Sequence, residues 1–274
     1  MTDMTLGYDE FCTFLEQHSG IFLGASKQYL VASRLRRLMA EQGLTSLNEL
    51  INRLQSVTQT KLKTQVIDAM TTNETLWFRD NHPFQVLEQK LLPEFSGRLA
   101  SKRLRVWSAA CSTGQEPYSI AMILSEYRQQ NRFLSAGADI VATDISPTAL
   151  AQARSGEYST LAIGRGLDPV KLKQHFTEIS SGRFKIDPII AADIDFRALN
   201  LQDSYALLGR FDLVFCRNVL IYFSADFKRD ILTRIHATLN PGGYLLVGAS
   251  EAVHGLSDLY EMVHCRPGIL YKKI

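Results

Sequence analysis

A turn rich in small residues connects a predicted strand to a predicted helix, in the sequence WSAACSTGQEP of residues 107–117. Gly114 is the one glycine of this turn. Small side chains let a ligand approach the backbone at a helix N-terminus, although this is not the G-x-G-x-x-G pattern of dinucleotide-binding proteins. Glu116, in the first helical turn, fits the helix dipole and could also face a cationic ligand. Taken alone, the pattern fits an ordinary tight connection equally well.

An acidic residue, Asp144, ends the next predicted strand, ADIVATD. An acid at this position of an α/β sheet can accept hydrogen bonds from the ribose hydroxyls of an adenosine cofactor. Capping of the next helix does not explain Asp144, because Ser146 already provides a cap. The turn and the acid together favour a nucleoside cofactor, and from these residues NAD remains possible.

Polar residues also follow a third predicted strand, in the sequence FDLVFCRNVLIYF of residues 211–223. The strand ends at Cys216, and Arg217 and Asn218 come directly after it. This places both at the carboxyl edge of a parallel sheet, where ligands bind. Tyr222 lies four residues past Asn218, where it is either a half-buried core tyrosine or a functional side chain.

Basic residues gather between positions 21 and 67, although the whole chain carries a formal net charge of only +2. The stretch contains Lys27, Arg34, Arg36, Arg37, Arg53, Lys61 and Lys63, against the two acids Glu41 and Glu49. The near-neutral total argues against a protein built for nucleic acid. A local basic surface suits an acidic partner, and a solvated helical surface is the other interpretation.

Short helices are predicted for the first 70 residues, from apolar spacings of three and four in residues 8–17, 27–42 and 45–55. Thr45 or Ser46 caps the third helix and Gly43 ends the second. On a helical wheel one face of the second helix carries Val31, Leu35, Leu38 and Met39. Arg36 lies opposite that face with Arg37 nearby, while Arg34 lies at its edge and either snorkels or borders a cleft.

A polar linker follows, in which Asn73 or Thr75 is expected to cap the next helix. After about residue 100, strands and helices alternate, which is typical of a doubly wound α/β sheet. Strands are predicted at 103–109, 138–144, 211–216 and 243–250, helices at 116–130, 146–156 and 225–240, and two short strands around residues 266–268. Between Gly156 and Phe211, a helix at 170–176 and three short strands, RFKID, PIIAAD and IDFRALNL, suggest a small β-rich insertion.

The composition is that of a globular protein, with 46% hydrophobic and 21% charged residues among 274. No run of about 18 apolar residues predicts a transmembrane helix, and the N-terminus lacks the pattern of a signal peptide. The four cysteines are far apart without a C-x-x-C motif, which indicates reduced thiols in a cytoplasm. The six histidines show no metal-ligand spacing.

The motifs together resemble the chemotaxis receptor glutamate O-methyltransferases, the CheR family, over nearly the whole chain. The resemblance rests on TTNETLWFRD, VWSAACSTGQEPYSIAM, ATDISPTALAQARSGEYS, ALNL, FDLVFCRNVLIYF, PGGYLLVGASE and the basic segment SRLRRL. It implies an all-α N-terminal domain at 1–70 and a linker with a cofactor-contacting helix at 71–100. A class I (Rossmann-like) methyltransferase domain at 101–274 would carry a small antiparallel β-subdomain at about 170–200.

The resemblance also implies a site for S-adenosylmethionine, with S-adenosylhomocysteine as product and no metal. The implied cofactor contacts are Asn73, Thr75, Arg79, Glu116, Asp144, Asn200, Leu201, Cys216 and Arg217. Among them, Asp144 would hold the ribose, Glu116 would face the methionine or sulfonium end, and Asn200 and Leu201 would flank the adenine. Cys111 departs from the family pattern, which often has Ala or Gly there, and a small thiol should fit.

The implied reaction is methyl transfer to glutamate carboxylates on the helical bundle of a chemoreceptor. A glutamate is already ionised at neutral pH, so the reaction needs positioning and exclusion of water rather than a general base. We expect Arg79 and Tyr222 to steer the carboxylate by hydrogen bonds. Docking to the acidic receptor helices is expected from Lys27, Arg34, Arg36, Arg37 and Arg53. The turn between Phe176 and Phe184 is short beside family members that hold a receptor C-terminal tail, so strong tail binding is not expected.

Two other functions stay open at this point. A methyltransferase for a nucleic acid or a small molecule would fit the same cofactor motifs, but the basic stretch has few aromatic residues for base stacking, and no Asn-Pro-Pro-Tyr-like motif follows FDLVF. A non-catalytic cofactor sensor that binds receptors is the alternative outside enzymes, and the presence of Arg79, Asp144 and Tyr222 argues against it. Turnover on a receptor separates these cases.

Overall fold

The computed structural model describes residues 7–24, 26–99, 102–130, 137–266 and 268–274. The chain folds into two compact units. The first contains the described residues of Met1–Thr72, together with Asn200–Asp203 and Tyr222–Lys228. The second contains Asn73–Leu199, Ser204–Ile221 and Arg229–Ile274.

In the described part of residues 1–72, the first unit contains α1 (Tyr8–Ser19), α2 (Gln28–Glu41), α3 (Leu47–Leu54) and α4 (Thr60–Met70). The apolar face predicted for α2 is confirmed, because Val31, Leu35, Leu38 and Met39 are all buried while Arg36 and Arg37 are exposed. These residues join those of α1, α3 and α4 in one apolar core. Helix α4 was not among the predicted helices, although its buried residues Leu62, Val66 and Met70 recur at the spacing of four that is typical of a helix.

Side-chain caps define the start of α3 as the sequence predicts. Ser46 Oγ accepts a hydrogen bond from Glu49 N, at 3.2 Å. Glu49 reaches back to Thr45 N, just before the N-cap, at 2.8 Å, so the two side chains together fix the start of the helix, as in a capping box. Gly43 follows α2 with a φ of 64°, a left-handed conformation that glycine adopts without strain.

The helices after the linker are α5 (His82–Val86), the π-helical turn η1 (Leu87–Leu91) and α6 (Leu92–Leu99). The prediction that Asn73 or Thr75 caps α5 is wrong. Asn81 occupies the N-cap position without a side-chain cap, and Pro83 lies in the first turn. A tight turn at residues 77–80 separates the polar cluster from the helix, so the helix begins later than the cluster suggests.

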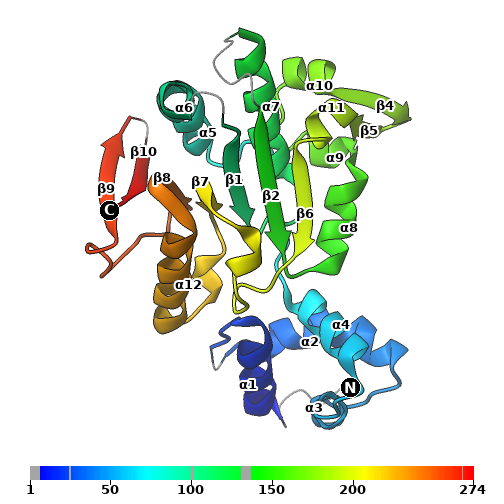
Figure 1. Ribbon diagram of the computed structural model, residues 1–274. Coiled ribbons are helices and arrows are strands. Elements are labelled where there is room, and N and C mark those ends of the chain that lie inside the picture. The colour runs from blue at the N-terminus through cyan, green and yellow to red at the C-terminus, as the bar shows by residue number, and fades with distance from the viewer. Residues whose placement is uncertain (1–6, 25, 100–101, 131–136, 267) are drawn as a thin grey trace. The chain divides into compact units, whose positions relative to one another are not determined.

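A seven-stranded sheet forms the centre of the second unit, in the order β6-β2-β1-β7-β8-β10-β9 (Figure 1). Its strands are β1 (Leu104–Ala109), β2 (Ala138–Asp144), β6 (Ile194–Ala198), β7 (Phe211–Cys216), β8 (Leu239–Val247), β9 (Tyr260–Cys265) and β10 (Gly268–Lys273). The first five in sheet order are parallel, and β10 and β9 are antiparallel additions, with Pro267 between them outside the described residues. The predicted doubly wound α/β sheet is confirmed.

Helices and short turns connect these strands. They are α7 (Gln115–Gln130), α8 (Pro147–Ser155), α9 (Thr160–Ile163), α10 (Pro169–His175), α11 (Pro188–Ala191), η3 (Ala206–Leu208), η4 (Leu220–Tyr222) and α12 (Ala225–Thr238). The signals predicted for α8 are confirmed: Ser146 Oγ accepts from Ala149 N, and Gly156 ends the helix with a φ of 62°. Helix α7 is buried along most of its length, and its residues pack with those of β1 and β7 in the main core.

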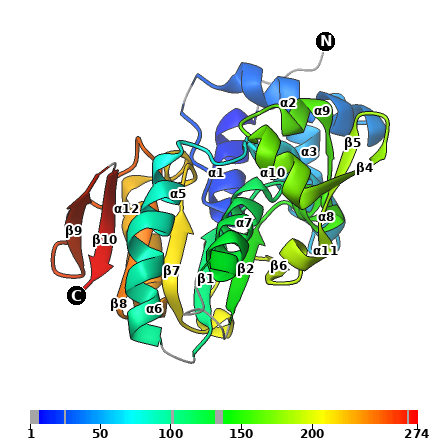
Figure 2. The ribbon, with the colours of Figure 1, turned by 90° about the horizontal axis from the view of Figure 1, so that it is seen from above.

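The insertion between Gly156 and Phe211 contains a separate three-stranded antiparallel sheet, in the order β3-β5-β4. Its strands are β3 (Glu157–Ser159), β4 (Phe176–Ser180) and β5 (Arg183–Ile186). Figure 2 shows β4 and β5 beyond the β6 end of the large sheet. One predicted strand of this stretch is wrong: PIIAAD forms the helical turn α11, because Asp187 caps it and Pro188 starts it. The strand predicted in IDFRALNL is confirmed as β6, but it pairs with β2 in the large sheet rather than within the insertion.

Candidate functional site

The carboxyl ends of the central strands meet at one edge of the large sheet. Ala109 of β1 lies opposite Thr143 of β2 on one side and Cys216 of β7 on the other. Cys216 in turn lies opposite Val247 of β8. The turns that leave these four strands therefore lie next to one another, at the edge where α/β sheets bind ligands.

The turn from β1 to α7 has an unusual backbone. Ala110, Ser112 and Gly114 all have positive φ, of 59°, 52° and 96°. The positive φ of Gly114 favours glycine, and so does the lack of space there. A Cβ at this position would lie 3.0 Å from both Ala153 Cβ and Tyr158 Oη. Left-handed backbone at residues other than glycine persists only where the surroundings fix it. Here the turn is fixed in part by Cys111 N, which donates to Thr143 O at 2.9 Å.

Asp144, at the end of β2, organises the turns on both sides of it. Its Oδ2 accepts from Ser112 N at 2.7 Å, and its Oδ1 accepts from Ser146 N at 2.8 Å. The residue is buried. A carboxylate can accept about four hydrogen bonds, so these two are compatible with further bonds from a pair of hydroxyl groups.

The linker runs along these turns. Asn73 O accepts from Ser112 Oγ at 2.9 Å, and Asn73 Nδ2 donates to Ser146 Oγ at 3.3 Å. Trp77 is fully buried, and its indole N–H donates to Ala162 O at 3.1 Å. Thr75 lies half-buried between these two anchors. The linker therefore lies beside the loops that follow β1 and β2.

A tight turn at the end of the linker carries Arg79. Phe78, Asp80 and Asn81 have φ of 49°, 65° and 53°, so three of four consecutive residues are left-handed. The Arg79 side chain turns back along the linker, and its Nη1 donates to Glu74 O at 3.0 Å. This concentration of left-handed residues requires strong tertiary anchoring.

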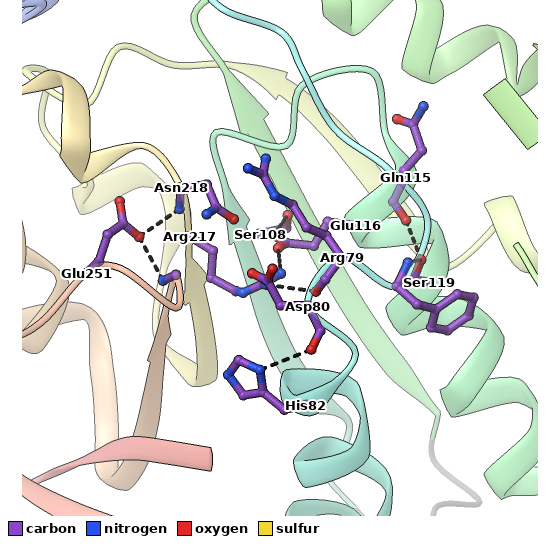
Figure 3. Close-up of polar contacts among 12 residues, drawn as sticks. Arg79, Asp80, His82, Ser108, Gln115, Glu116, Ser119, Arg217, Asn218 and Glu251 are labelled. Carbon is purple, nitrogen blue, oxygen red and sulfur yellow. Dashed lines mark hydrogen bonds and ion pairs between the residues drawn. The ribbon is translucent and has the colours of Figure 1, made fainter. Parts of the chain in front are cut away.

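Arg217 supplies that anchoring from the end of β7 (Figure 3). Its Nη2 donates to Arg79 O and to Asp80 Oδ2, each at 2.8 Å. Its Nη1 donates to Glu116 Oε2 at 2.9 Å, and Glu116 Oε1 accepts from Ser108 Oγ at 2.7 Å. The Arg217 side chain is only 1% exposed. This buried ion-pair network joins β1, α7, the linker turn and β7.

Both cysteines near this edge are buried and neutral. Burial raises the pKa of the Cys111 thiol well above its ordinary value, and the Asp144 carboxylate adds to the effect. Burial also raises the pKa of Cys216, with smaller contributions from Glu251 and Glu116. A protonated thiol is a poor nucleophile, so these side chains act as small packing groups.

The remaining proposed contacts, Asn200, Leu201 and Tyr222, belong to the first unit. Asn200 Nδ2 donates to His18 O at 2.8 Å, and its Oδ1 accepts from Gln202 N at 3.1 Å. Leu201 is buried. Tyr222 is half-buried, and its backbone oxygen accepts from Phe22 N at 2.8 Å.

Of the five basic residues expected to dock a partner, Arg34 has a structural role that explains its place at the edge of the apolar face. Its guanidinium donates to Met70 O, to Thr71 O at 2.9 Å and to Thr72 Oγ1 at 2.6 Å. It therefore satisfies carbonyl groups that the end of α4 leaves unpaired. These hydrogen bonds give Arg34 a capping role that the sequence did not predict.

The other four basic residues lie on the exposed surface of the first unit. Arg37 is 92% exposed and pairs with Glu41 at 3.3 Å. Arg36 and Lys27 are exposed, and Arg53 donates to Gln42 O at 3.3 Å. An exposed ion pair contributes little to stability, so the charges of Arg36 and Arg37 are available to an acidic partner.

Three residues of the site were missed by the sequence interpretation: Ser108, Asp80 and Glu251. Asp80 follows Arg79 directly, and its acidity beside a predicted site residue was the available signal. Glu251 ends the quoted motif PGGYLLVGASE but was given no role. Its carboxylate binds the turns that leave β7 and β8. Ser108 has no local signal, because it is one of several small residues in a buried strand.

Two family models match the chain. The one described as "CheR methyltransferase, SAM binding domain" matches residues 73–269, well over half of the chain. The chain belongs to the CheR methyltransferase family. The model described as "CheR methyltransferase, all-alpha domain" matches residues 6–71. This CheR-family chain is thus an S-adenosylmethionine-dependent methyltransferase, which confirms the resemblance seen in its motifs.

Relatives of similar length match the chain from end to end. "Chemotaxis protein methyltransferase Cher2" of Pseudomonas putida is 55% identical over 273 residues, which is 99% of each chain. "Chemotaxis protein methyltransferase 1" of Pseudomonas aeruginosa is 56% identical over 273 residues, again 99% of each. A protein of the same name from Vibrio cholerae is 50% identical over 276 residues, with 99% of both chains covered.

The residues at the sheet edge of this CheR-family chain fit S-adenosylmethionine. The Asp144 carboxylate suits two ribose hydroxyls, and the small side chains from Ser108 to Ser112 leave the backbone accessible to a ligand. The Arg217 guanidinium also has a donor to spare, since its buried Nε has no hydrogen-bond partner among the described residues. Such a donor fits an anionic group, and S-adenosylmethionine has a carboxylate.

Across the described ranges, no group of three or more His, Cys, Asp or Glu side chains is arranged to hold a metal ion. Among the helices of those same ranges, none combines the length and apolar character needed to cross a bilayer.

Proposed function

We propose that this CheR-family enzyme forms methyl esters on glutamate side chains of chemoreceptor cytoplasmic domains. The observation that carries the proposal is the 50–56% identity, over the full chain, to proteins named chemotaxis protein methyltransferases. The exposed basic residues of the first unit support it, since an acidic helical bundle is their natural electrostatic partner. The reaction would take place in the cytoplasm, where these receptor domains lie.

Bound at the edge of the sheet, S-adenosylmethionine would supply an activated methyl group for transfer to a carboxylate oxygen. The resemblance to the family supports nine residues as its contacts: Asn73, Thr75, Arg79, Glu116, Asp144, Asn200, Leu201, Cys216 and Arg217. Glu116 would face the cationic end while remaining paired with Arg217. That pairing keeps Glu116 in place before the cofactor arrives, which reduces the reorganisation needed for binding.

The acceptor needs orientation more than activation. A glutamate side chain has an ordinary pKa of about 4.3, so it is an anion at neutral pH and needs no general base. A strong ion pair would orient it but would also reduce its nucleophilicity. We propose that Arg79 and Tyr222 each provide hydrogen bonds for this orientation, and that exclusion of water assists the transfer.

The roles of Arg79 and Tyr222 can be tested by substitution. Arg79→Ala and Tyr222→Phe are each expected to lower kcat for receptor methylation by about tenfold, the equivalent of one lost charge-assisted or neutral hydrogen bond in the transition state. Binding of S-adenosylhomocysteine, measured by calorimetry, separates loss of turnover from loss of cofactor. Variants that bind the cofactor normally and keep full turnover would exclude these roles.

Charge reversal tests the docking surface. The double variant Arg36→Glu with Arg37→Glu is expected to lower kcat/KM for the receptor by about tenfold at low ionic strength, and by less at high salt, because salt screens exposed charges. Lys61→Glu with Lys63→Glu is the matched control, since it changes the net charge of the first unit equally, on α4. Equal effects of the two double variants, or activity independent of salt, would argue against a defined docking surface.

The substrate itself is tested by the chemistry of the product. The enzyme is incubated with S-adenosylmethionine carrying a radiolabelled methyl group and with a chemoreceptor cytoplasmic domain. Label that mild base releases as methanol identifies a carboxyl ester, because methylated amines are stable to base. Absence of label despite cofactor binding would redirect the search to a nucleic acid, a small molecule or a sensor role. A receptor C-terminal tail peptide is not expected to bind strongly, since the β4–β5 turn is short.

A further inference from the structure

A tyrosine of the insertion donates a hydrogen bond to the turn between β1 and α7. Tyr158, the middle residue of β3, is 3% exposed, and its hydroxyl donates to Thr113 O at 2.8 Å. The same hydroxyl lies against Gly114, where a Cβ would approach it to 3.0 Å. Burial raises the pKa of the Tyr158 phenol well above its ordinary value, so the hydroxyl stays protonated and remains a donor. The insertion therefore contacts this turn directly.

The turn that Tyr158 contacts belongs to the proposed cofactor site. Ser112 precedes Thr113, and its N donates at 2.7 Å to Asp144, the carboxylate proposed for the ribose. Ser112 has a φ of 52°, a conformation that residues other than glycine keep only where surrounding contacts fix it. A backbone hydrogen bond of Cys111 fixes the start of the turn, and the Tyr158 hydroxyl fixes its end.

The insertion holds the linker through a second set of contacts. Trp77 N donates to Arg165 O at 3.0 Å, and the Trp77 indole N–H donates to Ala162 O at 3.1 Å. The indole packs edge-on against the Tyr158 ring, with centroids 4.9 Å apart, and against the Phe176 ring of β4 at 5.4 Å. The linker and the β1–α7 turn, which both contribute to the proposed cofactor site, are thus held by the same insertion.

Packing alone does not require the hydroxyl at position 158, because a phenylalanine ring would fill the same space. Tyr118 offers a comparison within the same core. It is 1% exposed, and its hydroxyl also donates to a backbone oxygen at 2.8 Å, but this is Ala153 O near the end of α8. The two tyrosines therefore form the same kind of bond with different segments, and only the bond of Tyr158 reaches the cofactor turn.

We propose that the insertion stabilises the cofactor site, with Tyr158 as the positioning residue that holds the β1–α7 turn in the form that binds S-adenosylmethionine. Tyr158, Trp77 and Thr113 all belong to the second unit. The inference rests on the proposed function, because it takes this edge of the sheet as the place of the cofactor. Tyr158 touches neither the cofactor nor the acceptor in this assignment. A turn that is already held loses little freedom on binding, so the effect is expected in cofactor affinity rather than in the turnover number.

The test is Tyr158→Phe, which removes the hydroxyl and keeps the ring against Trp77. We expect the Kd for S-adenosylhomocysteine, measured by calorimetry, to rise by about threefold to tenfold, which corresponds to the net contribution of one hydrogen bond. The KM for S-adenosylmethionine is expected to rise to a similar extent, while kcat stays within about twofold of wild type. Tyr118→Phe is the matched control. It is expected to lower the urea midpoint about as much as Tyr158→Phe does, but to leave the Kd within about twofold of wild type.

Hydrogen exchange provides a measurement on the wild-type protein itself. We expect S-adenosylhomocysteine to slow amide exchange in residues 157–166 by about threefold or more, although none of them is a proposed cofactor contact. The reason is reciprocity: if the insertion favours binding, then binding favours the closed form of the insertion. The β9–β10 hairpin, at the other end of the large sheet from β6, is the internal control and is expected to exchange at an unchanged rate.

Equal Kd values in wild type and Tyr158→Phe would overturn the inference. Equal rises of the Kd in both tyrosine variants would also overturn it, because the effect would then come from general stability rather than from the turn. If Tyr158→Phe does not fold, the exchange measurement decides, and unchanged exchange in residues 157–166 would overturn the inference. A wild type that binds S-adenosylhomocysteine but gives no base-labile label on a receptor would contradict the proposed acceptor alone, since neither the Kd nor the exchange rates depend on the acceptor.

Discussion

Replacing Arg217 with methionine is expected to lower the free energy of unfolding of the second unit by about 3–5 kcal/mol, the usual effect of removing one partner from a buried ion pair. The Arg217 side chain is 1% exposed and Glu116 is 12% exposed, so water replaces little of the lost interaction. The substitution also releases Arg79 O and Asp80 from the strained turn of the linker. Binding of S-adenosylmethionine is expected to weaken with it, because Arg79 and Glu116 both lose their anchor.

Tryptophan fluorescence suits this measurement. The chain has two tryptophans, Trp77 and Trp107, and both are fully buried in the second unit. Urea unfolding followed by tryptophan emission therefore reports that unit, and the shift in midpoint at constant slope gives the change in stability. Arg183→Met is the matched control, since Arg183 pairs with Glu157 at 2.7 Å but is 59% exposed. Its expected effect is below about 1 kcal/mol.

A second substitution separates the buried charge from the lost contacts. In the double variant Arg217→Met with Glu116→Gln, no uncompensated carboxylate remains beside Ser108. We expect this variant to recover part of the stability that Arg217→Met loses, because the unpaired buried charge is the main source of the loss. A double variant that is less stable than Arg217→Met would show instead that the hydrogen bonds of Glu116, rather than its charge, dominate.

Most of the strands and helices after residue 100 were predictable from the sequence because their signals are local. Ser146 before Pro147 marks the start of α8, and the apolar run FDLVFC marks a strand buried on both faces. PIIAAD shows the limit of such patterns. Six residues with an apolar run fit a strand or a helical turn equally well, and the deciding signal was Asp187, whose Oδ1 accepts from Ile189 N at 2.8 Å.

Partners that are far apart in the sequence were not predictable. Arg217 was expected to contact the cofactor, and nothing in RNVLIYF indicates that its guanidinium pairs with Glu116, 101 positions earlier. Arg34 likewise binds the end of α4, which lies 36 and 37 positions later. The local sequence showed that Arg217 follows a buried strand and that Arg34 lies at the edge of an apolar helix face. Only the tertiary structure shows which groups they bind. Motifs locate candidate residues in this way, whereas burial and long-range contacts determine their role.

A large loss of affinity for the cofactor product is expected when Asp144 is replaced. Asp144→Asn is expected to raise the Kd for S-adenosylhomocysteine by about 100-fold, since two hydrogen bonds to a buried charged group together contribute about 2–3 kcal/mol. The amide also places an NH2 group toward Ser112 N or Ser146 N, which the carboxylate now accepts. Calorimetric titration gives the Kd directly. Asp139→Asn is the matched control, because Asp139 is another acid of β2 but is 39% exposed and pairs with Arg103; no change in Kd is expected there.

A ligand analogue distinguishes a direct contact with the ribose from a collapse of the turn. The 2′,3′-dideoxy form of S-adenosylhomocysteine lacks the two hydroxyls that Asp144 would accept. If the contact is direct, the affinity of wild type for this analogue is about as low as the affinity of Asp144→Asn for the parent ligand. The variant then binds the two ligands equally well. If Asp144 acts only through the backbone of Ser112 and Ser146, the variant loses affinity for both ligands equally and keeps the same preference as wild type. The second result would remove Asp144 from the cofactor contacts and leave it as an organiser of the turns after β1 and β2.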